Sequence, residues 1–201
     1  ILSLMRKKEF AQSAVALLLL CCTFAEVAVA DIDHIKITQE KVNFVNGYSD
    51  FRALKEKLAS LYGVKEENVF VSNGSDDILN FSFMAFCNDT DRPVRFPEIS
   101  YGFYKVYAEL YGVKYEAIPL KADLGIDISD YLGNNGNVVI ANPNAPTGIA
   151  LGIDEIETVV KANPDFIVLI DEAYVDFGGE SCLPLLDKYD NLLIVRTYSK
   201  S

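Results

Sequence analysis

The sequence predicts an α/β fold with three layers, in which helices cover both faces of a doubly wound, mostly parallel sheet. From about residue 50 onward, short apolar runs alternate with stretches whose apolar residues recur at helical spacing. The run over 166–170 is wholly apolar, as expected for a strand covered on both faces. Because such sheets bind ligands at the carboxyl ends of their strands, the residues after each run are the candidate site residues.

The first helix is expected over 50–62. Its apolar residues recur every three or four positions, Asp50 can cap its start and Gly63 can close its end. A strand over 68–71 then leads through a polar glycine turn into a buried helix over 78–86. The alternation continues with strands expected over 94–97, 114–118, 138–141, 166–170 and 192–195, and helices over 101–111 and 154–161.

The first 30 residues differ from the rest of the chain. Arg6, Lys7 and Lys8 precede an apolar run over 14–25, and small residues follow it, which is the layout of a secretory signal peptide. The alternatives are an apolar helix or a segment foreign to the native protein, and the run is short for a membrane span. We therefore divide the chain into a signal-like or non-native segment, 1–30, and a folded domain, 31–201.

The composition excludes several kinds of site and partner. The formal net charge is −11 and no basic block is long, which argues against binding nucleic acid. The only histidine is His34, and the cysteines lack the spacing of metal ligands; they are Cys21, Cys22, Cys87 and Cys182. We therefore expect neither a metal site nor a serine–histidine triad.

Two strand ends suggest binding sites for charged groups. Gly74, Ser75 and Asp76 open a helix directly after a strand, so backbone N–H groups, a hydroxyl and the helix dipole converge as in a phosphate site. Asp171 follows the most apolar strand, where a carboxylate is costly to bury unless a cation or several donors meet it. For both, an ordinary cap or loop is the alternative.

Three further positions suit a small aromatic ligand. Tyr101 precedes Gly102, which leaves room for a ring to stack on the tyrosine, with core packing as the alternative. The Asn/Pro loop over 142–148 offers amide side chains, or is a plain turn. Lys200 follows the last apolar run; a desolvated lysine amine forms Schiff bases with carbonyl compounds, whereas a solvated lysine has no such role.

The order of these motifs resembles the fold type I family of pyridoxal-phosphate enzymes, the aspartate aminotransferase superfamily. Residues 171–177, DEAYVDF, and 196–200, RTYSK, are similar to segments of its histidinol-phosphate aminotransferase group. The resemblance extends from about Val42 to Ser201. It implies that 31–201 is part of the large cofactor-binding domain, and that the C-terminal small domain is missing.

The resemblance implies pyridoxal 5'-phosphate as the cofactor and three catalytic residues. Lys200 would hold the cofactor aldehyde as an aldimine and then shuttle a proton. Asp171 would pair with the protonated pyridine nitrogen, and Tyr174 would donate to the phenolic oxygen.

The remaining implied contacts bind the cofactor. Tyr101 would stack on its ring, and the phosphate would be held by Gly74, Ser75, Asp76 and Ser199. Tyr48 matches a tyrosine that in this family reaches the phosphate of the neighbouring subunit. The resemblance therefore implies a homodimer with shared active sites.

The sequence departs from the family pattern in three places. Ala145 stands where an asparagine usually contacts the phenolic oxygen, so either Asn144 substitutes or Tyr174 acts alone. An Asn-Glu-Asn-Pro-like stretch is missing before Tyr48. The chain also stops one residue after Lys200, before the arginines expected for the phosphate and the substrate carboxylate.

The resemblance implies transamination of histidinol phosphate with 2-oxoglutarate and glutamate, a step of histidine biosynthesis. The alternatives are a decarboxylase of the same fold, of the threonine-phosphate type, and a non-catalytic remnant or binding module. The implied partners are a small-molecule amino donor and a 2-oxo acid, with no membrane. The cytoplasm is expected, against the signal-like residues 1–30, because the motifs extend over far more of the chain.

Overall fold

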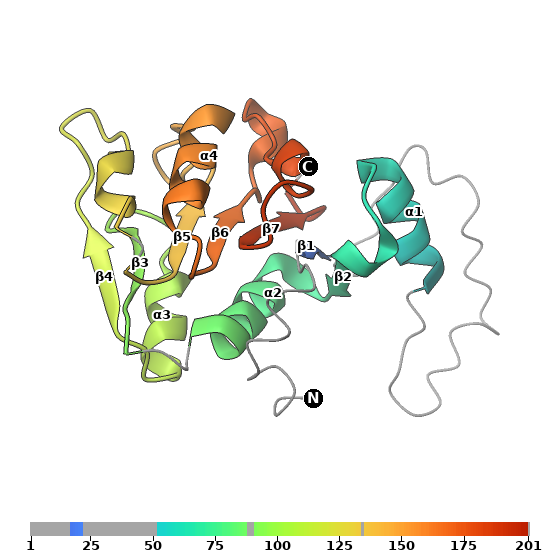
Figure 1. Ribbon diagram of the computed structural model, residues 1–201, viewed down its shortest axis with the longest axis horizontal. Helices are drawn as coiled ribbons and strands as arrows, with labels where there is room; N and C mark the ends of the chain where they lie inside the picture. Colours follow the sequence, from blue (N-terminus) through green and yellow to red (C-terminus); the bar gives the residue numbers. More distant parts are fainter. Residues whose placement is uncertain (1–16, 22–51, 88–90, 134, 201) are drawn as a thin grey trace.

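Seven strands form one parallel sheet, which confirms the predicted fold class (Figure 1). The computed structural model describes residues 17–21, 52–87, 91–133 and 135–200. The strand order is β2-β1-β7-β6-β5-β3-β4, and all six neighbouring pairs run parallel. The strands are β1 (Leu17–Cys21), β2 (Val69–Ser72), β3 (Val94–Pro97), β4 (Tyr115–Ile118), β5 (Val138–Ala141), β6 (Val168–Asp171) and β7 (Leu192–Thr197).

Helices cover both faces of the sheet. They are α1 (Arg52–Tyr62), α2 (Gly74–Ser82), α3 (Phe103–Leu110) and α4 (Ile153–Ala162). In Figure 1, α4 lies on one side of the central strands and α2 and α3 lie on the other. Successive side chains of a strand point to opposite faces, so Val138 and Ile140 pack in the core with α4, whereas Val139 and Ala141 pack with α2 and α3. A smaller core joins α1 to β2.

The helix after β2 begins earlier than its apolar pattern predicted, at the glycine where the phosphate motif was expected to open a helix. The apolar pattern placed its start at residue 78, but α2 begins at Gly74 and continues through a π-helical turn, Phe83–Cys87. Gly74 has a φ of 97°, in the left-handed region where glycine is favoured over residues with a Cβ. The expected glycine turn is therefore the first turn of the helix, which brings the helix start directly to the end of β2.

Strand β1 lies between β2 and β7, and the sequence did not predict it. Leu18 pairs with Val69 on one side and with Ile194 on the other. Its five residues belong to the run interpreted as part of a signal-like segment, because a short apolar run has no periodicity that separates a strand from other apolar segments. The rest of residues 1–30 lies outside the described residues. In the part of the chain that is described, no helix is long and apolar enough to cross a membrane.

Candidate functional site

A cavity of about 190 Å³ lies where the carboxyl ends of β5, β6 and β7 approach the start of α2. It is lined by Gly74, Ser75, Asp76, Tyr101, Ala141, Ala145, Asp171, Ala173, Tyr174, Ser199 and Lys200. The structure thus brings together every site residue predicted from the sequence except Asn144 and Tyr48. Tyr48 lies outside the described residues.

The start of α2 forms one wall of the cavity. The first N–H groups of a helix have no acceptor within the helix, and the helix dipole adds partial positive charge there, so Ser75 and Asp76 lie where an anion is favoured. The carboxylate of Asp76 accepts a 2.6 Å hydrogen bond from the Tyr101 hydroxyl. This contact ties the helix start to the aromatic wall.

Asp171 ends β6 with its carboxylate buried beside the cavity. It is 5% exposed, and its place in the strand puts it on the same face as Leu169, toward α2 and α3. The Tyr104 hydroxyl donates to Asp171 Oδ2 at 2.8 Å, and the Ala173 N–H donates to Oδ1 at 3.1 Å.

Burial determines how Asp171 titrates. It raises the pKa of this carboxyl to about 6, although the two hydrogen bonds and the nearby Lys200 oppose the rise. Asp76 adds to the rise because it brings a second negative charge to the same cavity. At neutral pH Asp171 is therefore mostly ionised, and it lacks a close cationic partner within the described chain.

Tyr101 offers a supported aromatic surface. Its ring packs edge-on against Tyr104 and lies parallel to Phe103, with centroids 5.6 Å apart in each pair. Burial, and then the hydrogen bond to Asp76, raise the pKa of the Tyr101 phenol, so its hydroxyl remains a donor. Geometry and protonation together hold this ring in one place at the cavity wall.

Lys200 and Ser199 line the cavity just after β7. The Lys200 ammonium lies 5.2 Å from the centroid of the Tyr174 ring, within the range of a cation–π interaction. The Ser199 N–H donates to Thr197 Oγ1 at 3.1 Å, and the two hydroxyls lie 2.7 Å apart. These contacts fix the course of the chain between the last strand and the lysine.

Asn144 lies beside the cavity rather than in its lining. Its side chain is buried, donates to the Ile99 carbonyl at 2.9 Å and accepts from the Ser100 hydroxyl at 2.8 Å. Ala145 is the loop residue that lines the cavity. The amide of Asn144 is thus used to hold the Asn/Pro loop against the segment before Tyr101.

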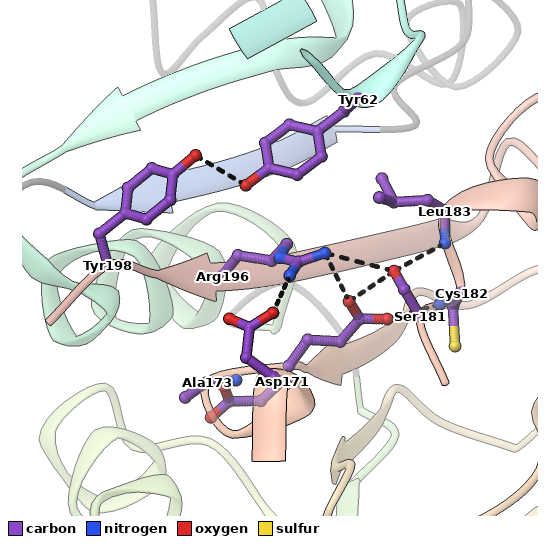
Figure 2. Close-up of polar contacts among 10 residues, drawn as sticks. Tyr62, Asp171, Ala173, Ser181, Cys182, Leu183, Arg196 and Tyr198 are labelled. Atoms are coloured by element: carbon purple, nitrogen blue, oxygen red, sulfur yellow. Dashed lines mark hydrogen bonds and ion pairs between the residues drawn. The ribbon is translucent and has the colours of Figure 1, made fainter. Parts of the chain in front are cut away.

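A second polar cluster lies behind Asp171, on the α4 face of the sheet (Figure 2). Glu172 is buried and accepts from the Cys182 N–H at 2.6 Å and from the Ser181 hydroxyl at 2.8 Å. Arg196 of β7 lies 3.6 Å from Glu172 and 3.1 Å from Asp176. These contacts join the end of β6 to the end of β7, the two strands that lead to Asp171 and Lys200.

Arg196 also packs against Tyr62 of α1, which in turn contacts the chain after β7. Its guanidinium lies 5.1 Å from the centroid of the Tyr62 ring, and the Tyr62 hydroxyl lies 2.8 Å from that of Tyr198 (Figure 2). The segment just before Lys200 is therefore attached to α1 as well as to β6.

Sequence reasoning missed Tyr104, the Ala173 N–H and the contact between Glu172 and Arg196. Tyr104 was interpreted only as part of an aromatic helix. Tyr101 precedes α3, which begins at Phe103, so no helical spacing relates the two tyrosines, and the sequence does not single out Tyr104. The Ala173 N–H and the contact between Glu172 and Arg196 depend on how the strands are placed in the sheet. Neither had a signal in the sequence.

The chemistry of the cavity suits a small molecule with an anionic group and a cationic aromatic ring. The helix start supplies N–H donors, the buried Asp171 can pair with a ring cation, and Tyr101 supplies a flat surface. Lys200 adds an amine that can form a Schiff base with an aldehyde.

Comparison with known proteins agrees with this chemistry. The model of the family "Aminotransferase class I and II" matches residues 17–201. Over 153 residues the chain is 51% identical to a histidinol-phosphate aminotransferase of Lactococcus lactis subsp. cremoris (strain SK11), which covers 76% of this chain and 43% of the relative. The chain thus spans less than half the length of this curated relative.

Solved structures share the fold. A histidinol-phosphate aminotransferase from Sinorhizobium meliloti, in complex with pyridoxal-5'-phosphate, has a TM-score of 0.66 at 24% identity, covering 74% of this chain and 42% of that one. An L-threonine-O-3-phosphate decarboxylase from Porphyromonas gingivalis has a TM-score of 0.61 at 25% identity, covering 73% and 44%.

Proposed function

This chain belongs to the class I and II aminotransferase family, and we propose that it is part of a pyridoxal-phosphate-dependent enzyme that transfers the amino group of histidinol phosphate. Glutamate and 2-oxoglutarate would be the other amino-acid and oxo-acid pair. The observation that carries this proposal is the convergence of Asp171, Tyr174 and Lys200 on one cavity together with the start of α2. The name of the Lactococcus relative, at 51% identity, supports the choice of substrate.

The cavity residues divide the work of holding the cofactor. Asp171 would pair with the protonated ring nitrogen, Tyr101 would stack on the ring and Tyr174 would donate to the phenolic oxygen. The phosphate would be held by Gly74, Ser75, Asp76 and Ser199. Because the Asp76 carboxylate is engaged with Tyr101, its backbone N–H is the group we assign to the phosphate. We leave Asn144 out of this set, since its amide is used within the loop.

Lys200 is the residue to which we assign proton transfer. When bound, pyridoxal phosphate supplies an electron-withdrawing ring that stabilises negative charge on the substrate carbon bearing the amino group. Lys200 would bind the cofactor aldehyde before substrate arrives, and would then take the proton from the substrate Cα and deliver it to the cofactor carbon that had carried the aldehyde. The nearby carboxylate of Asp171 would keep the ring nitrogen charged.

A decarboxylase acting on a phosphorylated amino acid is the second candidate. The likeness to the Porphyromonas decarboxylase favours it, since that structure has a similar TM-score. Loss of carbon dioxide and loss of the Cα proton use the same ring as electron acceptor. The two candidates are separated by supplying the complete protein with histidinol phosphate and 2-oxoglutarate, or with threonine phosphate, and measuring glutamate or carbon dioxide.

We further propose that the protein is a cytoplasmic homodimer and that residues 31–201 form part of its cofactor-binding domain. Tyr48 would reach the phosphate held by the neighbouring subunit. The biosynthetic relatives support the location, and the family resemblance supports the shared site.

The cofactor assignment is tested by adding pyridoxal phosphate to the chain, reducing with borohydride and locating the added mass by peptide mass spectrometry. We expect a visible absorption band and a label on Lys200, both lost in Lys200→Ala. Lys188→Ala, which removes an exposed lysine paired with Glu157, is the matched control and should keep both. An equally strong band in Lys200→Ala would refute the assignment.

A further inference from the structure

The hydroxyl of a buried tyrosine contacts the carboxylate beside the cavity. Tyr104 of α3 has no exposed surface, and its hydroxyl donates to Asp171 Oδ2 at 2.8 Å. Asp171 Oδ1 accepts from the Ala173 N–H at 3.1 Å. Each carboxylate oxygen therefore has one donor, and the two donors come from different elements of the fold.

We propose that Tyr104 is a positioning residue, which holds Asp171 in the orientation and the ionised state that a cationic ring nitrogen requires. This inference rests on the proposed function, because Asp171 needs this state only if it faces such a ring. Hydrogen bonds to the charged form of a carboxyl favour that form, and a second donor also removes its freedom to rotate.

The packing of Tyr104 suits this role. Its ring lies between Phe96 of β3, with centroids 5.9 Å apart, and Tyr101, which meets it edge-on. The hydroxyl is therefore fixed by the core and not by solvent. Tyr104 also contacts both Asp171, which we assign to the ring nitrogen of the cofactor, and Tyr101, which we assign to the face of that ring.

The charges around Asp171 have opposing effects on its pKa, so the hydrogen bond from Tyr104 matters for its ionisation. Asp76 at the start of α2 disfavours a second negative charge, and Lys200 after β7 favours it. Of the neighbouring phenols, Tyr101 and Tyr107 also sense the charge on Asp171. Against the cost of burial, the hydrogen bond from Tyr104 is the largest effect that lowers the pKa of Asp171.

Tyr104 itself remains a donor. Burial, and then the charge of Asp171, hold the pKa of its phenol well above the ordinary value. Its protonation therefore does not change as Asp171 titrates.

The test compares Tyr104→Phe with the unmodified chain by following the carboxyl carbon of Asp171 by NMR as pH rises, without added cofactor. Asp171→Asn assigns the signal. We expect the midpoint in Tyr104→Phe to move up by about one pH unit, since one of two donors is lost. An unchanged midpoint would overturn the proposal.

Tyr131→Phe is the matched control. Tyr131 is as buried as Tyr104 and lies in the core beside α4, and its hydroxyl has no hydrogen-bond partner among the described residues. Deleting this hydroxyl should leave the Asp171 midpoint in place. A shift of equal size in both variants would mean that loss of any buried hydroxyl moves the titration, which would also overturn the proposal.

Folding and cofactor binding provide two further readouts. If Tyr104→Phe is unstable at pH 8, its titration is started at pH 5, where Asp171 is mostly protonated. If this variant alone then unfolds as pH rises, the unfolding also shows that ionised Asp171 needs the hydrogen bond from Tyr104. Binding of added pyridoxal phosphate should weaken in Tyr104→Phe by about threefold at pH 6.5 and less at pH 9, because ionised Asp171 is depleted only near its midpoint.

The two proposals fail in different ways. If the unmodified chain shows no binding of pyridoxal phosphate that depends on Lys200, the proposed function fails, and the NMR midpoint still measures the effect of Tyr104 on Asp171. If binding is present but the midpoint and its pH profile are the same in Tyr104→Phe, only the positioning role fails.

Discussion

Asp171 combines a cost to stability with the cofactor-binding role that we propose for it. Its carboxylate is buried at the end of a strand, where burial raises its pKa to about 6. The two hydrogen bonds that it accepts reduce this cost, but no cation lies in close contact within the described residues. A buried carboxylate held in this way is prepared for a cationic ligand, and binding that ligand repays the cost of burial.

Asp171→Asn should change how stability depends on pH. The folded-state pKa of about 6 exceeds the usual 3.8, so the folded state binds this proton more tightly than the unfolded chain. The stability that this group contributes is full below pH 3.8 and is lost as pH rises through 6. Unmodified chain should therefore lose about 2–3 kcal/mol of unfolding free energy over this window, which Asp171→Asn does not lose.

The measurement is urea unfolding of both proteins at several pH values between 4 and 8, without added cofactor. The difference between them cancels the titration of all other groups. Parallel curves across this range would contradict the prediction. With pyridoxal phosphate added, the unmodified chain should instead be the more stable of the two proteins. The variant lacks the charge that would meet the ring nitrogen.

At this scale the sequence reveals residues whose chemistry is uncommon for their position. The places of Asp171 and Lys200 at the cavity could be predicted, because Asp171 directly follows an apolar run and Lys200 lies a few residues after the last one. Tyr104 could not be singled out, since its role depends on which side chain of β6 faces α3. Asn144 is a similar case: its amide type was recognised, but its partners, Ile99 and Ser100, come from a distant loop.

Among the elements, the ends of β6 and β7 are joined on the face opposite the cavity. Asp171 and Glu172 are adjacent, so their side chains point to opposite faces: one toward α3 and the other toward Arg196 of β7. Glu172 is fully buried, and burial raises its pKa despite hydrogen bonds from the Cys182 N–H and the Ser181 hydroxyl. The ion pair is thus a fixed connection between the strands that lead to Asp171 and Lys200.

Arg196→Met should destabilise the chain by about 3 kcal/mol at pH 8, because it leaves a buried carboxylate without its cation. The loss should shrink toward pH 4, where Glu172 is protonated and needs no cation. Urea unfolding at both pH values measures this. The control is Lys105→Met, which removes an exposed ion pair with Glu109 and should cost well under 1 kcal/mol. Equal small losses in both variants would show that Arg196 contributes no more than a surface charge.

The strands were easier to predict than the helix boundaries and β1. Strands such as Val138–Ala141 were predicted with their exact bounds, because polar or proline-containing loops end them sharply. The apolar pattern missed the start of α2 by four residues, because the first turn is polar and faces the cavity, whereas the motif at Gly74, Ser75 and Asp76 indicated it correctly. Residues 17–21 form a strand because they pair with β2 and β7 on either side. These partners are distant in the sequence, so the local pattern could not predict β1.

For the whole molecule, the sheet topology explains why the site could be assembled from distant parts of the chain. All neighbouring strands run parallel, so the ends of β5, β6 and β7 open on one edge of the sheet, beside the start of α2. Residues separated by more than a hundred positions, such as Ser75 and Ser199, therefore line one cavity. What the topology of one chain does not supply is Tyr48 of a neighbouring copy, which the proposed dimer would add.

The shared site predicts that two variants with weak cofactor binding form one intact binding site when they assemble into a mixed dimer. Mixing Lys200→Ala with Tyr48→Phe, by unfolding and refolding the two chains together, should give roughly half mixed dimers if assembly is random. In a mixed dimer one site lacks both residues, whereas the other takes Lys200 from one chain and Tyr48 from its partner. Titration with pyridoxal phosphate should therefore reveal a tight-binding fraction that neither variant shows alone. As a control, the two variants are refolded separately and then mixed. This sample should show only the sum of the binding of the two variants, unless their subunits exchange. A monomer in sedimentation, or two variants that bind only additively, would contradict the shared site.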